Sequence, residues 1–271
     1  MLIMARHSQR ITLSVILPAY NEQDRLPPYL TSIMRYLSQR GDPYEIVVVD
    51  DGSRDQTAPR IREFAVDRPV VRLIQLPRNS GKGAAVRAGM LAAHGTLRLM
   101  TDADGATPIQ EIERLEHALS EDNDLAIGSR FLGSRDSRYR VQARWHRTVL
   151  GNTFNRMAQR LGLEGITDTQ CGFKLFRKRV AEDLFSISRI DGYGFDLELL
   201  YVARHRNYRI AEVPINWTDQ PGSKVHVVRD GLRMFRELLA VRRHAAQGAY
   251  QRRESADRFQ ELRQAAECRR Y

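Results

Sequence analysis

The sequence is poor in cysteine, with only Cys171 and Cys268 among its 271 residues. The two lie far apart and form neither a disulfide framework nor the close spacing of a zinc site. A reducing compartment such as the cytoplasm is therefore the expected location. The seven histidines are scattered, away from clusters of carboxylates or cysteines. This scatter gives no support to a zinc enzyme or a serine hydrolase.

Long apolar runs are missing as well. No stretch approaches the roughly 20 apolar residues that a membrane-spanning helix needs, and residues 1–10 lack the apolar core of a signal peptide. We therefore expect any membrane contact to be peripheral, at the inner face of the cytoplasmic membrane. Acidic residues are outnumbered, since 43 Lys and Arg against 33 Asp and Glu give a net charge of +10. This charge favours a polyanionic partner: nucleic acid, an anionic membrane or a phosphorylated substrate.

What the sequence does contain is an alternation of short apolar strands and amphipathic helices. Strands are predicted at residues 11–19, 44–49, 70–76 and 97–100. Helices are predicted at 26–40, through residues 61 and 64, and after residue 83 to an end at residue 94. This order predicts a Rossmann-like α/β fold, a mostly parallel central sheet with helices on both faces. In the second half we expect strands at 124–128 and 209–214, a mobile loop at 131–142, and helices at 143–162, 192–206 and 229–244.

The same patterns predict how the chain is divided. Residues 1–10 are expected to be a flexible N-terminus, and residues 11–228 a single catalytic domain. Residues 229–271 are expected to form a basic amphipathic helix followed by a charged tail. The basic helices at 144–161 and 229–244 have two interpretations. Either they lie on an anionic membrane surface, or their apolar sides pack on the catalytic domain.

Polar residues follow three of the predicted strands, at 20–22, 50–53 and 102–104. Ligands of open α/β sheets bind beyond the carboxyl ends of the strands, so we expect these residues to meet in one crevice. Asp102 and Asp104 are two carboxylates that can hold Mg²⁺ or Mn²⁺ together with a substrate phosphate. The alternative is structural, with Asp104 in a turn and Asp102 as a helix cap.

Two further polar clusters suggest contacts with a nucleotide. Asp50 and Asp51 are adjacent carboxylates that can accept hydrogen bonds from a base or from ribose hydroxyls, or they can simply form a capped turn. We assign ligand contact to Asp50 and helix capping to Ser53. Residues 79–83, NSGKG, resemble a phosphate cradle without the Walker A pattern. Lys82 is accordingly either a phosphate contact or a solvated side chain.

Several motifs together resemble a known family. Residues 18–22 (PAYNE), 49–53 (VDDGS) and 102–104 (DAD) look like the inverting family 2 glycosyltransferases of GT-A fold. Residues 168–176 (DTQCGFKLF), 195–201 (FDLELLY), 212–217 (EVPINW) and 222–224 (GSK) are similar to dolichyl-phosphate β-glucosyltransferases, and the resemblance covers about residues 12–240. It implies UDP-glucose as the donor, a dolichyl- or undecaprenyl-type polyprenyl phosphate as the acceptor, and Mg²⁺ or Mn²⁺ as the cofactor. Ala106 stands where mannosyl relatives carry a glutamine.

The resemblance also assigns roles to individual residues, to which the patterns above add Asp51 and Lys82. Asp102 and Asp104 would hold the metal and, with Arg130, are the predicted catalytic residues. The predicted donor-binding residues are Pro18, Tyr20, Glu22, Asp50, Asp51 and Lys82. The predicted acceptor and phosphate residues are Arg130, Asp168, Gln170, Lys174, Asp196, Ser223 and Lys224.

Other functions remain open from the sequence alone. The nearest are a GDP-mannose-dependent polyprenyl-phosphate mannosyltransferase and a family 2 transferase with a soluble or polysaccharide acceptor. A nucleotidyltransferase also uses carboxylate-bound metal. A nucleic-acid-binding protein would match the positive charge, but no helix-turn-helix, zinc finger or aromatic RNA-binding signature is visible, so we expect no nucleic-acid partner.

Overall fold

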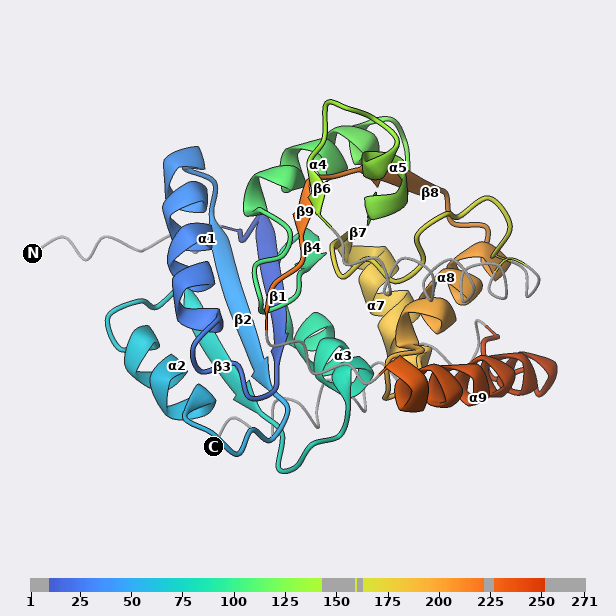
Figure 1. The fold of residues 1–271 in the computed structure, drawn as a ribbon, viewed down its shortest axis with the longest axis horizontal. Helices are drawn as coiled ribbons and strands as arrows, with labels where there is room; N and C mark the ends of the chain where they lie inside the picture. Colours follow the sequence, from blue (N-terminus) through green and yellow to red (C-terminus); the bar gives the residue numbers. More distant parts are fainter. Residues whose placement is uncertain (1–9, 143–158, 160–162, 222–226, 252–271) are drawn as a thin grey trace, which may run out of the picture.

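The computed structural model describes residues 10–142, 159, 163–221 and 227–251, arranged around one central sheet (Figure 1). This sheet has seven strands in the order β3-β2-β1-β4-β7-β5-β8. Their bounds are β1 Leu13–Ala19, β2 Tyr44–Asp50, β3 Val71–Gln75, β4 Leu97–Met100, β5 Leu125–Ser129, β7 Lys174–Arg177 and β8 Ile210–Pro214. A separate two-stranded sheet joins β6 (Val141–Gln142) to β9 (Trp217–Thr218).

The strand directions place the polar strand ends at one edge. β1 pairs in parallel with β2 and β4, and β5 pairs in parallel with β8. β7 is antiparallel to both β4 and β5, so it alone in this sheet runs the other way. The predicted mostly parallel sheet is thus confirmed. Lys174, the first residue of β7, pairs with Met100 and Ile127 and so lies at the edge where β4 and β5 end.

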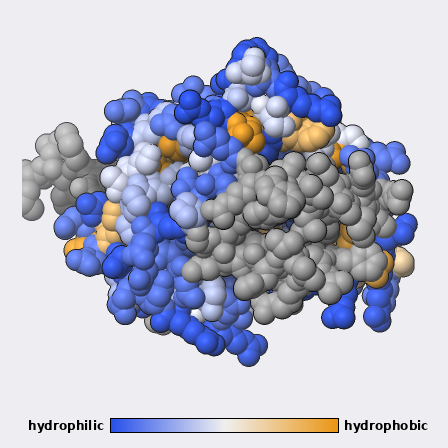
Figure 2. Space-filling model, in the orientation of Figure 1, coloured by the Kyte–Doolittle hydropathy of each residue, from blue (hydrophilic) through white to orange (hydrophobic). Residues whose placement is uncertain are grey.

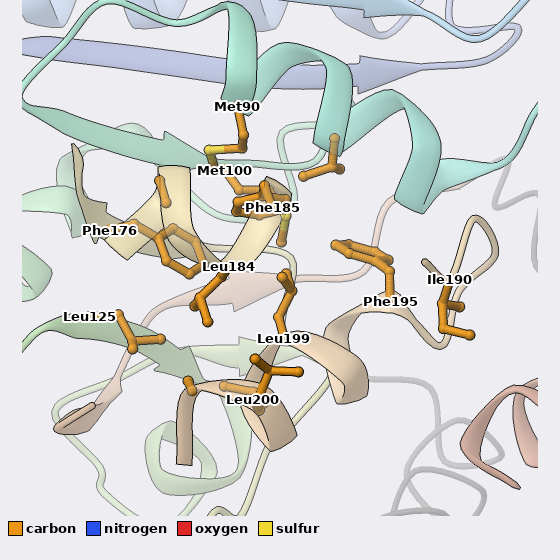
Figure 3. Close-up of a cluster of buried hydrophobic side chains, with 14 of the residues drawn as sticks. Met90, Met100, Leu125, Phe176, Leu184, Phe185, Ile190, Phe195, Leu199 and Leu200 are labelled. Atoms are coloured by element: carbon orange, nitrogen blue, oxygen red, sulfur yellow. The ribbon is translucent and has the colours of Figure 1, made fainter. Parts of the chain in front are cut away.

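Helices cover both faces of the sheet because the strands are apolar on both sides. In β1, Val15 and Leu17 belong to one buried cluster and Ile16 to the other. The first cluster packs against α1 (Leu26–Arg40), α2 (Thr57–Ala65) and α4 (Ile112–Ser120). The second packs against α3 (Lys82–Ala92), α7 (Lys178–Ile187), α8 (Phe195–His205) and α9 (Val227–Ala246). Figure 3 shows this second cluster, with Met90, Met100, Phe185 and Leu199 directed toward one another.

The part of the chain that follows β4 holds more regular structure than its sequence predicts. β7, α4 and α7 were not expected. Residues 131–142 are not a loop throughout, since α5 (Arg130–Ser134) and β6 occupy both ends. The helix expected at 143–162 lies outside the described residues, apart from residue 159. The predicted boundary between residues 228 and 229 falls inside α9, and the domain division remains a prediction.

The described surface on the face drawn in Figure 2 is mainly polar. Figure 2 shows hydrophilic residues over most of the coloured surface, with hydrophobic residues in small separate areas. Val66 and Leu239 are the large hydrophobic side chains that stand exposed, at 77% and 49%. None of the helices in the described part of the chain has the length and apolar character that crossing a bilayer requires.

Candidate active site

A cavity of about 370 Å³ opens where β1, β2 and β4 end. Each of the three polar strand ends contributes to its lining, through Tyr20, Asp51 and the pair Asp102 and Asp104. The predicted meeting of these residues in one crevice is therefore confirmed. The other lining residues are Pro18, Ala19, Glu22, Arg25, Asn79, Gly81, Lys82, Ala85, Ala103, Gly192, Tyr193 and Arg233.

Both carboxylates of the acidic triplet face positive charge. Lys82 Nζ lies 2.6 Å from Asp102 Oδ1, and Arg25 Nη1 lies 3.9 Å from Asp104 Oδ2. The backbone N–H of Ala106 donates to Asp104 Oδ1 at 3.0 Å, which fixes the turn that follows β4. Burial, and then the charge of Asp102, raises the pKa of Asp104. The site thus concentrates negative charge that an added cation would relieve.

The glycine-rich loop at residues 79–83 is built differently from the expected phosphate cradle. The carboxylate of Asp51 accepts hydrogen bonds from the N–H groups of Ser80 (2.7 Å) and Gly81 (2.9 Å). The N–H of Gly83 donates instead to the carbonyl of Asp191 at 2.7 Å. These backbone donors are already used inside the protein, so the backbone part of the cradle prediction is wrong. What the loop presents to the cavity is the side chain of Lys82.

Lys82 stays protonated in this setting. Burial alone would lower its pKa, but the negative charges of Asp102 and Asp196 outweigh that effect and raise the pKa above its ordinary value. A permanently charged ammonium at the N-terminus of α3 is suited to bind phosphate oxygens.

The other predicted donor residues divide into two groups. Pro18, Tyr20 and Glu22 line the cavity. Asp50 does not, because it is 1% exposed and accepts hydrogen bonds from the backbone N–H of Ser53 and the side chain of Gln75, each at 3.2 Å. Asp51 is the carboxylate of this pair that reaches the cavity lining.

Ser53 does not cap a helix, contrary to expectation. Its hydroxyl accepts a hydrogen bond from the N–H of Asn21 at 2.9 Å, and α2 begins only at Thr57. The bond ties the loop after β1 to the loop after β2. It therefore helps to hold Tyr20 at the cavity.

Among the residues predicted to bind the acceptor, Arg130 forms a two-pronged ion pair with Asp168. Arg130 Nε lies 2.8 Å from Asp168 Oδ2 and Nη2 lies 2.7 Å from Oδ1. Although burial opposes it, the guanidinium holds the pKa of Asp168 below its ordinary value. Glu212 in turn accepts hydrogen bonds from the N–H groups of Thr167 and Asp168, each at 2.8 Å. Glu212 thereby positions Asp168, which positions Arg130.

Lys174 and Asp196 form a second ion pair, which is fully buried. Lys174 Nζ lies 2.5 Å from Asp196 Oδ1, with the Lys174 side chain 0% and that of Asp196 5% exposed. The ammonium also donates to the carbonyl of Cys171. Both residues were predicted to bind the acceptor, but here they contact each other. Gln170 is half-buried, and Ser223 and Lys224 lie outside the described residues.

The cavity lining includes four polar or charged residues that the sequence interpretation did not assign to the site: Arg25, Asn79, Tyr193 and Arg233. Arg25 lies three residues after Glu22, in the turn that precedes α1, and the opposite charges at this spacing were a usable signal. Tyr193 lies just before α8, and Arg233 is one of several arginines in α9, so no local pattern distinguishes either of them. Asn79 is part of the glycine-rich loop that was singled out, where only Lys82 was assigned a role.

Known proteins resemble the chain over most of its length. The model of the family described as Glycosyl transferase family 2 matches residues 14–185. A dolichyl-phosphate beta-glucosyltransferase from Dictyostelium discoideum is 40% identical over 245 residues, which cover 86% of this chain and 74% of the relative. The human protein of the same name is 39% identical over 251 residues, with coverage of 88% and 77%.

Solved structures share the architecture at lower identity. Glucosyl-3-phosphoglycerate synthase from Mycobacterium tuberculosis, solved with Mn²⁺, UDP-glucose and glycerol 3-phosphate, is 21% identical with a TM-score of 0.64, covering 85% of this chain and 78% of that one. Mannosyl-3-phosphoglycerate synthase from Rubrobacter xylanophilus is 20% identical with a TM-score of 0.65, covering 89% and 76%. These structures confirm the predicted GT-A fold, and at such identity they speak to the fold alone.

Proposed function

Because the chain belongs to glycosyl transferase family 2, we propose that it transfers glucose from UDP-glucose to a polyprenyl phosphate, with inversion at the anomeric carbon. Relatives at 39–40% identity are named dolichyl-phosphate beta-glucosyltransferases. The structural observation that carries the proposal is the meeting of Tyr20, Lys82, Asp102 and Asp104 in one cavity at the strand ends. Such a cavity offers an aromatic ring for a base and charged groups for a diphosphate.

The donor would lie along this cavity. Pro18 lies near the end of β1 and Tyr20 directly follows the strand, and both offer apolar surface to the base. Lys82 would contact the diphosphate, which suits an ammonium that already lies 2.6 Å from a carboxylate and can exchange it for a phosphate oxygen. Asp51 keeps the loop that carries Lys82 in place through the two hydrogen bonds from Ser80 and Gly81.

A divalent cation, Mg²⁺ or Mn²⁺, fits the carboxylate pair as part of a shared shell. Asp102 and Asp104 expose 37% and 27% of their side chains toward the cavity region, so hard oxygen ligands are available. Within the described part of the chain no group of three or more metal-binding side chains occurs. Two carboxylates are sufficient for Mg²⁺ when substrate phosphates and water supply the remaining ligands. When bound, such a cation would neutralise charge on the departing UDP.

The acceptor phosphate would act as the nucleophile without a general base. A phosphate monoester has a second pKa of about 6 and is mostly dianionic at neutral pH. No histidine lines the cavity in the part of the chain that the structure describes. What such a reaction needs is positive charge that places one anion beside another. Arg130, held rigidly by Asp168, is suited to orient the acceptor.

We also propose peripheral contact with the inner face of the cytoplasmic membrane. Leu239, Arg242 and Arg243 are exposed and share one side of α9. On its other side Leu238 and Val241 are buried in the core, so α9 packs on the catalytic domain and still keeps a basic outer face. Each basic group near an anionic surface contributes about 1 kcal/mol of attraction. Absence of flotation with anionic liposomes at low salt would argue against this contact.

The proposed reaction is tested with purified protein, UDP-glucose labelled in the sugar and a short polyprenyl phosphate. We expect the label to move into the organic phase, and GDP-mannose to support much less transfer than UDP-glucose. If transfer from GDP-mannose were faster than transfer from UDP-glucose, GDP-mannose would replace UDP-glucose as the proposed donor. Label that appears only in a water-soluble or polymeric product would replace the acceptor, and label that stays in UDP-glucose would reject the proposal.

A further inference from the structure

Arg233 lines the cavity, although no local pattern in the sequence distinguishes it from the other arginines of α9. It lies in the first half of α9, which packs on the domain through Leu238 and Val241. It joins Arg25 and Lys82 in the cavity lining, although those two come from the N-terminal half of the chain. The side chain is 60% exposed, so its guanidinium can be reached from solvent.

The three cations of the cavity lining differ in how many of their donor nitrogens already form hydrogen bonds or ion pairs within the protein. Arg25 forms two hydrogen bonds with the carboxylate of Glu22, through Nε at 2.7 Å and Nη2 at 2.5 Å, and Lys82 is paired with Asp102. Arg233 donates through Nε to Glu237 Oε1 at 3.1 Å. Within the residues that the structure describes, its two terminal nitrogens have no hydrogen-bond partner. Arg233 therefore presents the unoccupied donors of this group, in the planar arrangement that matches a phosphate.

Glu237 holds Arg233 in position through a contact of its own. Its Oε2 accepts a hydrogen bond from the N–H of Gly194 at 2.7 Å, while Oε1 receives Arg233 Nε. A Cβ at either Gly192 or Gly194 would collide with the Glu237 side chain, so the loop before α8 fits closely around this carboxylate. Glu237 is 14% exposed and joins this loop, which lines the cavity, to α9.

From this arrangement we infer that Arg233 binds a phosphate group of one of the two substrates at the cavity, with Glu237 as the residue that positions its guanidinium. The inference rests on the proposed function for the identity of those substrates. The phosphate belongs either to the polyprenyl phosphate or to the diphosphate of UDP-glucose, which share the same anion chemistry. Arg130, the other arginine assigned to phosphate, is already engaged by Asp168 at two nitrogens.

The test measures the Kd of each ligand separately by calorimetry, using UDP-glucose and a short polyprenyl phosphate. Arg233→Ala is compared with Arg233→Lys and with the matched control Arg236→Ala, an exposed arginine of the same helix that does not line the cavity. We expect Arg233→Ala to weaken one of the two ligands about tenfold, because a charge-assisted hydrogen bond is lost. Arg233→Lys should recover part of the affinity, and Arg236→Ala should leave both Kd values unchanged.

The ligand that weakens identifies the phosphate that Arg233 binds. Glu237→Gln should weaken the same ligand by a smaller factor and leave the other unchanged, a selectivity that general unfolding would not produce. Unchanged Kd values for both ligands in Arg233→Ala would overturn the inference, as would equal losses in Arg233→Ala and Arg236→Ala. Wild-type protein that binds both ligands but transfers no glucose would reject the proposed function alone, because the Kd comparison does not depend on turnover.

Discussion

The predicted donor and acceptor sides of this protein use the same kinds of charged side chain in different ways. At the ends of β1, β2 and β4, Lys82, Asp102 and Asp104 are partly exposed and line a cavity. On the acceptor side, Lys174 and Asp196 are buried against each other. The difference shows that a charged residue within a family motif can be part of the folded framework. Burial and pairing decide which residues remain available to a ligand.

The largest expected difference between the two sides is in stability, and removing one partner of the buried pair tests it. Lys174→Met leaves Asp196 buried without the cation that is hydrogen-bonded to it, and we expect about 3–5 kcal/mol of lost stability. Lys82→Met, on the open side, should cost about 1 kcal/mol or less, because water reaches its partner Asp102. Urea denaturation of both variants measures the contrast.

A matched double variant separates charge pairing from packing. Lys174→Met combined with Asp196→Leu should recover most of the stability that Lys174→Met loses, since no unpaired charge remains. Equal stability losses for Lys174→Met and Lys82→Met would show that the two sides do not differ.

The next largest effect is expected on catalysis at the open side. Asp104→Ala should reduce transfer about 10³-fold, equivalent to about 4 kcal/mol of transition-state stabilisation. The melting temperature should stay within a few degrees of wild type, because the side chain is partly exposed. Asp24→Ala, which removes an exposed carboxylate outside the cavity lining, is the control. Near-normal turnover of Asp104→Ala in metal-stripped buffer would exclude the proposed metal role.

A glycine substitution tests geometry without changing any charge. A Cβ at Gly172 would collide with the carboxylate of Asp102. Gly172→Ala should therefore displace Asp102 and lower kcat about 10²-fold, since small misplacements in an active site are costly. Gly165→Ala, at a glycine with no neighbour within 4 Å of its Cβ, controls for glycine replacement in general, although its own φ of +82° strains an alanine. Equal activity in the two variants would mean that the position of Asp102 is unimportant.

The smallest expected effect concerns positioning on the acceptor side. The N–H groups of Thr167 and Asp168 donate to different oxygens of Glu212, and Glu212→Gln replaces one of these oxygens by an amide N–H₂ that cannot accept, so one of the two hydrogen bonds is lost. The loop should shift and loosen the hold of Asp168 on Arg130, which we expect to raise the KM for polyprenyl phosphate about fivefold. The KM for UDP-glucose should not change. Equal increases in both KM values would instead indicate general loosening of the site.

The apolar strands and the polar residues after them could be predicted from the sequence. Residues 46–49 (IVVV), for example, are apolar throughout, as expected for a strand buried on both faces, and the polar residues after three such strands meet in one cavity as expected. β7 was missed because KLFR is short and begins and ends with a charge. Its Lys174 is buried only because Asp196, 22 residues later, packs against it. Such pairings depend on tertiary contacts that local sequence does not encode.

The same reason explains why Arg233 was missed. In the sequence it is one of five arginines between residues 229 and 243, all in a basic helix. Its distinction comes from the loop before α8, which places Glu237 and the cavity beside it. Asp50 is the opposite case. Its place after a strand favoured ligand contact, whereas the fold buries it and brings Asp51 to the cavity.

The proposed role of Asp102 and Asp104 in metal binding is tested most directly by calorimetry. UDP-glucose is titrated into metal-stripped protein, with and without added Mn²⁺. If Asp102 and Asp104 share a cation with the donor diphosphate, Mn²⁺ should tighten UDP-glucose binding about tenfold or more in the wild type and have little effect in Asp102→Asn. Wild-type protein that binds UDP-glucose equally well with and without Mn²⁺ would contradict this role of the pair.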